Sequence, residues 1–159
     1  VSNGMVKGPY VTVGGKDLAY QDSATISEDE NAKPFRSLSA RGSIEYVVVP
    51  NYGAEEDYAG LDLTGKIALV QRGGGMYYEQ KERNAANAGA IGMLVYNNVP
   101  GMLYMSITDW KIPCAFISQA AGEYMKQQET QTLWPPPTPW WNPPPMAWPT
   151  SPAGALPPS

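Results

Sequence analysis

The chain has 159 residues, 16% of them charged, and a formal net charge of −4 at pH 7. This length is enough for one domain with a hydrophobic core, and the acidic balance argues against nucleic acid or an anionic membrane as a partner. Histidine is absent, which excludes a Ser-His-Asp or Cys-His catalytic set and a histidine-based zinc site within this chain. No apolar run approaches the roughly 18 residues of a transmembrane helix, so no membrane insertion is expected.

The N-terminal third predicts a hairpin, a loop and a strand. Residues 1–8 are expected to be a linker, and they show no signal-peptide pattern. Tyr10–Val13 and Lys16–Tyr20 predict two strands joined by a double-glycine turn. The polar stretch Gln21–Ser39 predicts a surface loop; its acidic cluster lacks the alternating EF-hand spacing, so a solvated loop is favoured over a calcium site. Ser43–Pro50 predicts the next strand.

The centre of the chain predicts a strand–helix–strand unit. Ile67–Val70 is a short apolar run typical of a buried strand, and three glycines at 73–75 then allow a sharp turn. Met76–Asn87 is rich in Glu, Gln, Lys, Arg and Ala and predicts a helix, with Met76, Glu79, Gln80 and Arg83 at helical spacing and Gly89 as its C-terminal cap. Ile91–Tyr96 is a second apolar run. Such a βαβ unit predicts two parallel strands with a right-handed crossover.

An unusually apolar loop, 102–110, follows this unit. Its large side chains either pack as a satellite core, which is the default expectation, or lie exposed for a partner. Pro113–Ser118 predicts another strand, and Ser118 is a good N-cap for a helix over Gln119–Gln128. The single cysteine, Cys114, reads as a small buried hydrophobe rather than a reactive thiol.

These elements together predict a hydrophobic core. Its expected members lie on the two central strands, on the third strand and on the inner face of the helix: Ile67, Leu69, Val70, Ala85, Ala88, Ile91, Met93, Leu94, Val95, Phe116 and Ile117.

Several motifs resemble the protease-associated (PA) domain family in order and spacing. The family's strand, helix and second-strand motifs are matched by Gly65–Val70, Arg72-Gly73, Lys81, Asn84-Ala85, Ala88–Ala90 and Tyr96–Asn98, and a later strand motif by Ile112-Pro113 and Ala115–Ser118. The resemblance covers about Val47 to Lys126. Two departures are Tyr77-Tyr78, where a phenylalanine is usual, and Gly75, where many secreted members have a cysteine.

The resemblance implies an α/β fold with a three-layer β/β/α arrangement, in which a small parallel sheet is joined by antiparallel strands. The PA domain would span residues 9–128. It also implies a non-catalytic domain of a secreted or cell-wall subtilisin-like serine protease, which modulates protein-substrate access or domain contacts. The implied partners are the parent's catalytic domain and protein or peptide substrates, no cofactor or metal is expected, and the implied location is extracellular or the bacterial cell envelope.

A second interpretation is a stand-alone α/β domain that binds a small ligand. Gly73–Gly75 before a helix could hold an anion at the helix N-terminus. The stretch lacks both the GxGxxG spacing and the Lys-Ser/Thr of a P-loop, so this signal is weak.

The tail, 129–159, differs from the rest of the chain. Beyond Glu129 it has no charged residue, but it holds four of the five tryptophans and eleven of the sixteen prolines. The tail can be back-translated into codons, and these codons can be read in the frame that starts two nucleotides later. In that frame every codon choice gives Val-Glu at Trp140–Asn142 and Ala at Trp148-Pro149. With particular third bases, Pro149–Ala155 gives Asp-Phe-Ser-Ser-Trp-Gly-Ala. Phe-Ser-Ser-Trp-Gly resembles the stretch just before the catalytic-serine segment of subtilisin-like proteases. We therefore expect a frameshift between Glu129 and Leu133 and a tail that does not pack on the domain; a polyproline ligand segment is the alternative.

A functional surface is expected where the two parallel strands end, because ligands of α/β sheets meet the carboxyl ends of the strands. The alternative is structural, with Arg72 tying loops together and the two asparagines acting as turn residues. The candidate substrate- or protein-binding residues are Gln71, Arg72, Gly73, Gly74, Asn97, Asn98, Met102, Tyr104, Met105 and Trp110.

Overall fold

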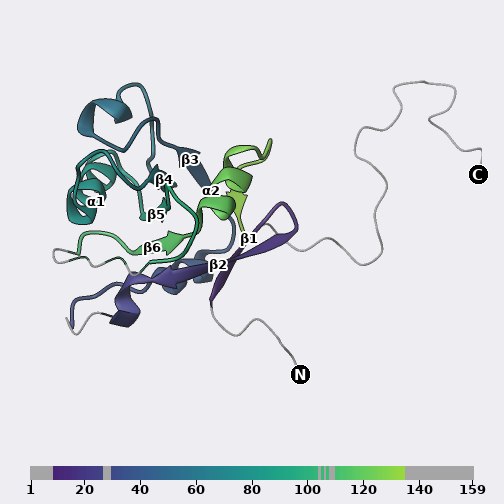
Figure 1. Ribbon diagram of the computed structural model, residues 1–159. Helices are drawn as coiled ribbons and strands as arrows, with labels where there is room; N and C mark the ends of the chain where they lie inside the picture. Colours follow the sequence, from purple (N-terminus) through teal and green to yellow (C-terminus); the bar gives the residue numbers. More distant parts are fainter. Residues whose placement is uncertain (1–8, 27–29, 104, 106, 108–109, 135–159) are drawn as a thin grey trace, which may run out of the picture.

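The computed structural model describes residues 9–26, 30–103, 105, 107 and 110–134 (Figure 1). The predicted linker 1–8 therefore lies outside the described residues. The elements are β1 (Tyr10–Val13), β2 (Lys16–Asp22), η1 (Ser23–Ile26), η2 (Phe35–Arg41), β3 (Ile44–Val48), η3 (Glu55–Tyr58), β4 (Ile67–Gln71), α1 (Tyr78–Asn87), β5 (Gly92–Tyr96), β6 (Cys114–Ile117), α2 (Gln119–Lys126) and β7 (Thr132–Leu133). None of the described helices is long and apolar enough to cross a membrane.

Among the described residues, seven strands form one mixed sheet in the order β1-β2-β6-β5-β4-β3-β7. Strands β3, β4, β5 and β6 run parallel to one another, whereas β2 joins β6 and β7 joins β3 in antiparallel pairs. Helix α1 crosses between β4 and β5 and lies on one side of the sheet (Figure 1). The α/β fold and the parallel βαβ unit are thus as predicted.

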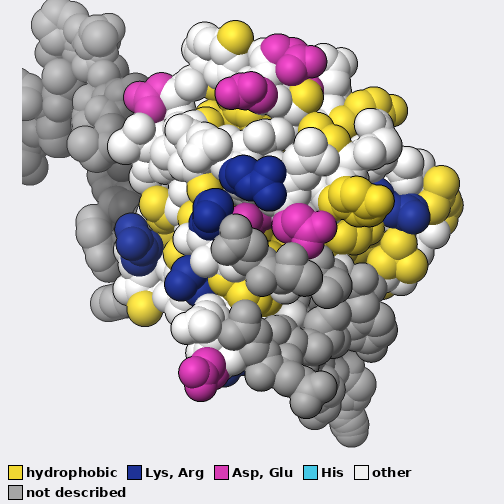
Figure 2. Space-filling view, turned by 90° about the vertical axis from the view of Figure 1, so that its left-hand side faces the viewer, with side chains coloured by type: hydrophobic (Ala, Val, Ile, Leu, Met, Phe, Trp, Pro, Cys, Tyr) yellow, Lys and Arg dark blue, Asp and Glu magenta, His cyan; other side chains and the backbone are white. Residues whose placement is uncertain are grey.

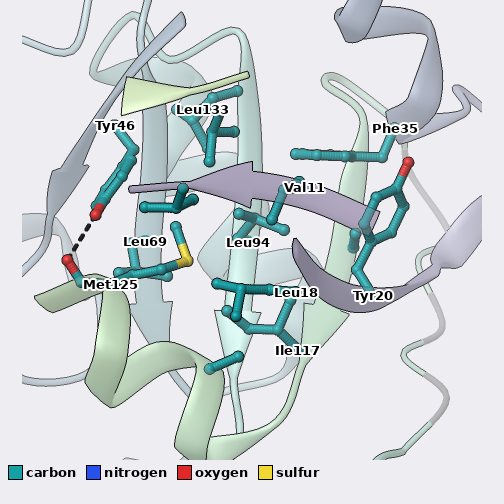
Figure 3. Packing of buried hydrophobic residues seen from close by; sticks show 14 of the residues in the cluster. Val11, Leu18, Tyr20, Phe35, Tyr46, Leu69, Leu94, Ile117, Met125 and Leu133 are labelled. Carbon is teal, nitrogen blue, oxygen red and sulfur yellow. Dashed lines mark hydrogen bonds between the residues drawn. The ribbon is translucent and has the colours of Figure 1, made fainter. Parts of the chain in front are cut away.

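The central strands are buried on both faces, which explains their continuous apolar runs. Ile67 and Leu69 of β4 point into a core enclosed by the sheet and α2, and Ala68 and Val70 point into a second core beneath α1. Figure 3 shows the first core, where the Tyr46 hydroxyl donates a hydrogen bond of 2.6 Å to the Met125 carbonyl at the end of α2. The sheet therefore separates two cores, the first beneath α2 and the second beneath α1.

Most of the predicted core is confirmed. Nine of the eleven expected side chains are buried, and Ala88 and Ile91 are half-buried against the cores. Cys114 is fully buried, and desolvation raises the pKa of its thiol, so a reactive thiol is not supported. Ser118 caps α2 as expected, because its hydroxyl accepts a hydrogen bond of 3.1 Å from the Ala121 N–H.

The expectation of a plain surface loop over Gln21–Ser39 is wrong in part. The stretch contains η1 and most of η2, and η2 buries Phe35 and Leu38 in the first core. The Asp22 carboxylate is buried and accepts hydrogen bonds from the N–H groups of Ala24 and Arg36, which holds the entry to this stretch. A single Phe and a single Leu among polar residues give no periodic signal, so the sequence concealed them.

The expectation that the tail does not pack is wrong for its first residues. Thr132 and Leu133 pair with Glu45 and Ile44 of β3, and Leu133 is fully buried in the first core. The next residue, Trp134, donates its N–H to the Thr12 carbonyl of β1 at 2.8 Å. The segment therefore joins β3 to β1, and the two edges of the sheet meet (Figure 1).

This closure predicts that Leu133 is as important to stability as a residue of the central strands. Leu133→Ala removes a fully buried side chain and should lower the free energy of unfolding by about 2–5 kcal/mol, similar to Leu69→Ala. Thr130→Ala, at an exposed neighbour, is the control and should change it by less than about 0.5 kcal/mol. Urea unfolding followed by far-UV circular dichroism measures all three, and a Leu133→Ala value equal to that of Thr130→Ala would show that β7 does not close the sheet.

Candidate functional site

The carboxyl ends of β4 and β5 lie side by side, as the sequence predicted. Gln71 pairs with Tyr96, and the Arg72 N–H donates to the Tyr96 carbonyl at 2.9 Å. The guanidinium Nη1 of Arg72 then donates to the side-chain oxygens of Asn97 at 3.0 Å and Asn98 at 3.2 Å. Three predicted site residues are thereby brought into direct contact.

Asn97 has a structural role within this group. Its side chain is buried, its Nδ2 donates to the Gly101 carbonyl at 2.9 Å, and its Oδ1 accepts from the N–H groups of Asn98 and Val99. These bonds fold the turn that follows β5 and fix the oxygen that holds Arg72. The alternative prediction, in which Arg72 ties loops together and the asparagines form a turn, therefore describes these hydrogen bonds correctly. Arg72 and Asn98 are nevertheless partly accessible at the surface.

Lys81 holds the glycine turn from beneath. Its side chain is fully buried, and Nζ donates to the carbonyl oxygens of Tyr52 at 2.6 Å, Gln71 at 3.0 Å and Gly73 at 3.0 Å. All three ammonium donors are thus used. Burial lowers the pKa of Lys81 to about 8, and the negative charge of Asp57 partly opposes this shift. A residue of α1 therefore fixes the ends of two neighbouring strands.

The loop after β3 is braced in the same way. Asn84, one turn beyond Lys81 on α1, donates its Nδ2 to the Gly53 carbonyl at 3.1 Å. The Asp57 carboxylate accepts from Asn51 Nδ2 at 2.8 Å and from the Ala54 N–H at 2.9 Å, and these hydrogen bonds lower the pKa of Asp57. The loop that carries Tyr52 is consequently held at both ends.

Tyr52 is a site residue that the sequence reasoning missed. Its ring lies against Gly73 and Gly74, where an added Cβ would come within 2.9 Å of the ring at Gly73 and 2.7 Å at Gly74. The ring nevertheless stays 39% exposed. Because β3 runs parallel to β4, the residues that follow β3 arrive at the same edge of the sheet. The available signal was an aromatic residue in the Asn51–Gly53 turn. This signal could be interpreted only with the knowledge that β3 is parallel to β4.

The apolar loop after β5 divides into exposed and buried parts. Met102 and Leu103 are exposed by 44% and 39%, whereas Met105 and Trp110 are buried in the second core. The expectation that Met105 and Trp110 serve as surface anchors is therefore wrong, and Tyr104 lies outside the described residues. The buried Glu82 of α1 draws the loop inward, since its carboxylate accepts the N–H groups of Lys111 and Ile112.

An open groove of about 540 Å³ adjoins the glycine turn. It runs from Arg72 past Gly73 and Gly75 to Met76 and the first residues of α1. Figure 2, which faces the α1 side, shows basic and acidic side chains close together with hydrophobic side chains exposed beside them. In the part of the chain that the structure describes, no group of three or more Cys, Asp or Glu residues is placed to hold a metal ion.

A protein-family model described as "PA domain" matches residues 6–125. The chain belongs to the PA domain family. The PA domain is 34% identical to the C5a peptidase of Streptococcus pyogenes over 124 residues, which are 74% of this chain and 10% of that protein. It is 39% identical to the minor extracellular protease Vpr of Bacillus subtilis over 90 residues, 54% of this chain and 11% of Vpr.

Solved structures agree with the PA domain fold. A zinc aminopeptidase from Bacillus subtilis, BSAP, superposes with a TM-score of 0.60 at 23% identity, covering 79% of this chain and 29% of that one. The subtilisin-like protease Apa1 of Pseudoalteromonas sp. AS-11 superposes with a TM-score of 0.53 at 18% identity, covering 78% and 31%. This chain covers only about a tenth of the two sequence relatives and less than a third of the two solved structures, so in those proteins the matched segment is a small part of a longer polypeptide.

The Lys81 contacts of this PA domain lead to a stability prediction. Lys81→Met keeps the apolar stem but leaves three carbonyls without their donor, so the free energy of unfolding should fall by about 2–4 kcal/mol. Lys33→Met, at an exposed lysine, should change it by less than about 0.5 kcal/mol. Urea unfolding at pH 7 measures both changes. An equal loss of stability in Lys81→Met and Lys33→Met would contradict a stabilising role for the three Lys81 hydrogen bonds.

The same variant tests the depressed pKa of Lys81. Between the folded pKa of about 8 and the ordinary value of 10.5, the unfolded chain binds more protons than the folded chain at this site, so the free energy of unfolding rises with pH. The stability difference between the unmodified chain and Lys81→Met should therefore widen across this window. If this stability difference became smaller between about pH 8 and pH 10.5, the lowered pKa of Lys81 would be contradicted.

Proposed function

We propose that this PA domain is a non-catalytic part of a secreted or cell-envelope subtilisin-like serine endopeptidase, where it modulates the access of protein substrates to the catalytic domain. The observation that carries the proposal is the match to the C5a peptidase and to an extracellular protease, of which the domain covers about a tenth. An aminopeptidase host is the second candidate, favoured by 40% identity over 85 residues, 51% of this chain, to aminopeptidase YwaD of Bacillus subtilis, of which it covers 18%. A stand-alone ligand-binding domain fits the family less well.

The geometry of the domain ends supports a place inside a host domain. The first described strand is β1, and the last described residue, Trp134, donates its N–H to the Thr12 carbonyl of β1. Entering and leaving segments that lie side by side can replace a surface loop of a host without separating the host's own residues. In this arrangement one end of the PA domain adjoins the host and the strand-end edge remains available to substrates.

The functional surface we propose is the edge formed by the carboxyl ends of β3, β4 and β5. It retains Gln71, Arg72, Gly73, Gly74, Asn98 and Met102 of the predicted set and adds Tyr52. Braced aromatic and arginine side chains on a rigid support are well suited to bind protein segments. The edge would hold a protein substrate near the catalytic domain, whereas a short peptide would not reach it.

We also propose that the coding sequence changes frame shortly after this domain. Leu133 is fully buried and Thr132 and Leu133 are in register with β3, which supports native sequence up to Leu133, the end of the expected interval. Charged residues are absent beyond Glu129, and the prolines of the tail begin at Pro135. A junction just after Leu133 fits these observations and would leave the concealed Phe-Ser-Ser-Trp-Gly downstream of the domain.

The frame proposal predicts one DNA sequence. Sequencing the source gene through the codons of Gln131–Ala155 should show codons that read Val-Glu and then Ala-Asp-Phe-Ser-Ser-Trp-Gly in the frame that starts two nucleotides later. A further open reading frame encoding protease sequence should continue from there. Third bases that do not encode this stretch would refute the frameshift and favour a native polyproline tail.

The access proposal predicts a difference between large and small substrates. In the parent protease, Met102→Ser with Leu103→Ser removes two exposed apolar side chains and should change kcat/KM for casein by about threefold or more. Cleavage of a chromogenic tetrapeptide should stay within about twofold. Lys66→Ser, just before the opposite end of β4, is the control and should affect neither. Equal effects on both substrates, or none on either, would remove this edge from the function.

A further inference from the structure

The groove beside the glycine turn carries an aromatic side chain that the fold does not use. Tyr78 packs edge-on against Phe116, with ring centroids 6.3 Å apart, and so belongs to the second core. Its neighbour Tyr77 lines the groove and is 75% exposed, the largest exposure among the large hydrophobic side chains that the structure describes. An exposed tyrosine offers a large contact area at a low cost in side-chain entropy.

Arg72 lines the same groove and has unused hydrogen-bonding capacity. Both of its side-chain bonds come from Nη1, so Nη2 and Nε remain available, and no ion pair involves Arg72 within the described residues. The two asparagine oxygens fix the plane of the guanidinium group. A guanidinium held in this way by neutral oxygens is pre-organised to accept a carboxylate in a bidentate pair.

The backbone at Gly75, which lies between Arg72 and Tyr77 in the chain, is open. Gly75 has a φ of +70°, and an added Cβ there would have no heavy atom within 4 Å. The Lys81 contacts to Gln71 and Gly73 hold the turn from below, so the open side faces solvent. An extended chain can approach the backbone at Gly75 without displacing a side chain.

Charge limits what fits. Arg72 lines one part of the groove and Glu79 another, and the whole chain carries a net charge of −4. A polyanion such as nucleic acid would be repelled by Glu79 and by the overall charge. A peptide with one acidic side chain next to an aromatic side chain places the carboxylate on Arg72 and the ring on Tyr77.

We propose that the groove between Arg72 and Tyr77 docks an extended protein segment through an acidic side chain adjacent to an aromatic one. This rests on the proposed function, because it names the feature of the protein substrate that the edge selects. Arg72 supplies the charge selection, Tyr77 supplies apolar contact, and the glycine turn supplies close access to the backbone.

The test is a titration of the ¹⁵N-labelled 159-residue chain, followed by ¹H–¹⁵N NMR, with acetyl-Gly-Glu-Phe-Pro-Gly-amide and with its twin carrying Gln in place of Glu. The amides of Gly73, Gly75 and Tyr77 should shift, with a Kd on the order of 0.1–1 mM for the Glu peptide. The Gln peptide should bind about threefold to fivefold more weakly at about 20 mM salt, and this preference should shrink at about 500 mM salt.

Two variants and one control sharpen the test. Arg72→Gln should bind both peptides equally, and Tyr77→Ser should weaken both. Arg83→Gln, at an exposed arginine of α1 outside the groove, should leave both unchanged. The amide spectrum of each variant reports folding, and the salt dependence of the unmodified chain tests the charge selection without any variant.

Equal binding of the two peptides by the unmodified chain, or no shift at the three groove amides at about 5 mM peptide, would overturn the inference. The outcome is separable from that of the parent protease. Groove binding without any effect on casein cleavage would support the groove and refute the access function. An effect on casein without groove binding would refute the groove and keep the access function.

Discussion

The buried ammonium group of Lys81 connects the parts of the molecule on which the candidate site depends. Its three hydrogen bonds reach the loop after β3, the last residue of β4 and the glycine turn, while its stem belongs to α1. A buried charge is costly unless its donors are satisfied, so this amine requires all three carbonyls to stay in place. The positions of Tyr52 and Gly73 are thereby coupled to the packing of α1 on the sheet.

This coupling explains why a turn of three glycines can carry a defined surface. Gly73–Gly75 alone would be free to adopt many conformations. Here the turn is held by Lys81 from below and covered by the Tyr52 ring at Gly73 and Gly74, while Arg72 is held by the asparagines that follow β5. The result is a rigid edge with exposed side chains, in which the flexible residue type provides access and the neighbours provide order.

The closure of the sheet by residues 131–134 gives the domain its second constraint. Leu133 fills the core between β3 and β1, and the N–H of Trp134 reaches Thr12, so the edges of the sheet are joined. The same contacts bring Trp134, the last described residue, next to β1, the first described strand. We propose that this end of the domain faces the host and that the strand-end edge faces the substrate. A PA domain built in this way can be attached to a host on one side and meet a protein substrate on another, which is the division of labour that we propose.

The sequence by itself determined the local elements and the family. Ile67–Gln71, Tyr78–Asn87 and Gly92–Tyr96 follow from short apolar runs, glycine punctuation and helical spacing, and the Ser118 cap follows from hydroxyl chemistry. These signals are local because main-chain sterics and side-chain periodicity act over a few residues. The meeting of Arg72 with Asn97 and Asn98 could also be anticipated, since parallel strands place their ends together.

Only the tertiary structure decided which side chains are covered. Met105 and Trp110 are as apolar as Met102, but the loop that carries them is drawn under α1 by Glu82, and so they are buried while Met102 is exposed. Leu133 lies in a region without a helical or strand pattern, and its burial depends on β1 and β3, more than eighty residues earlier in the chain. Tyr52 joins the site because β3 is parallel to β4. Burial of this kind depends on which distant segments meet, and a local pattern contains no information about that.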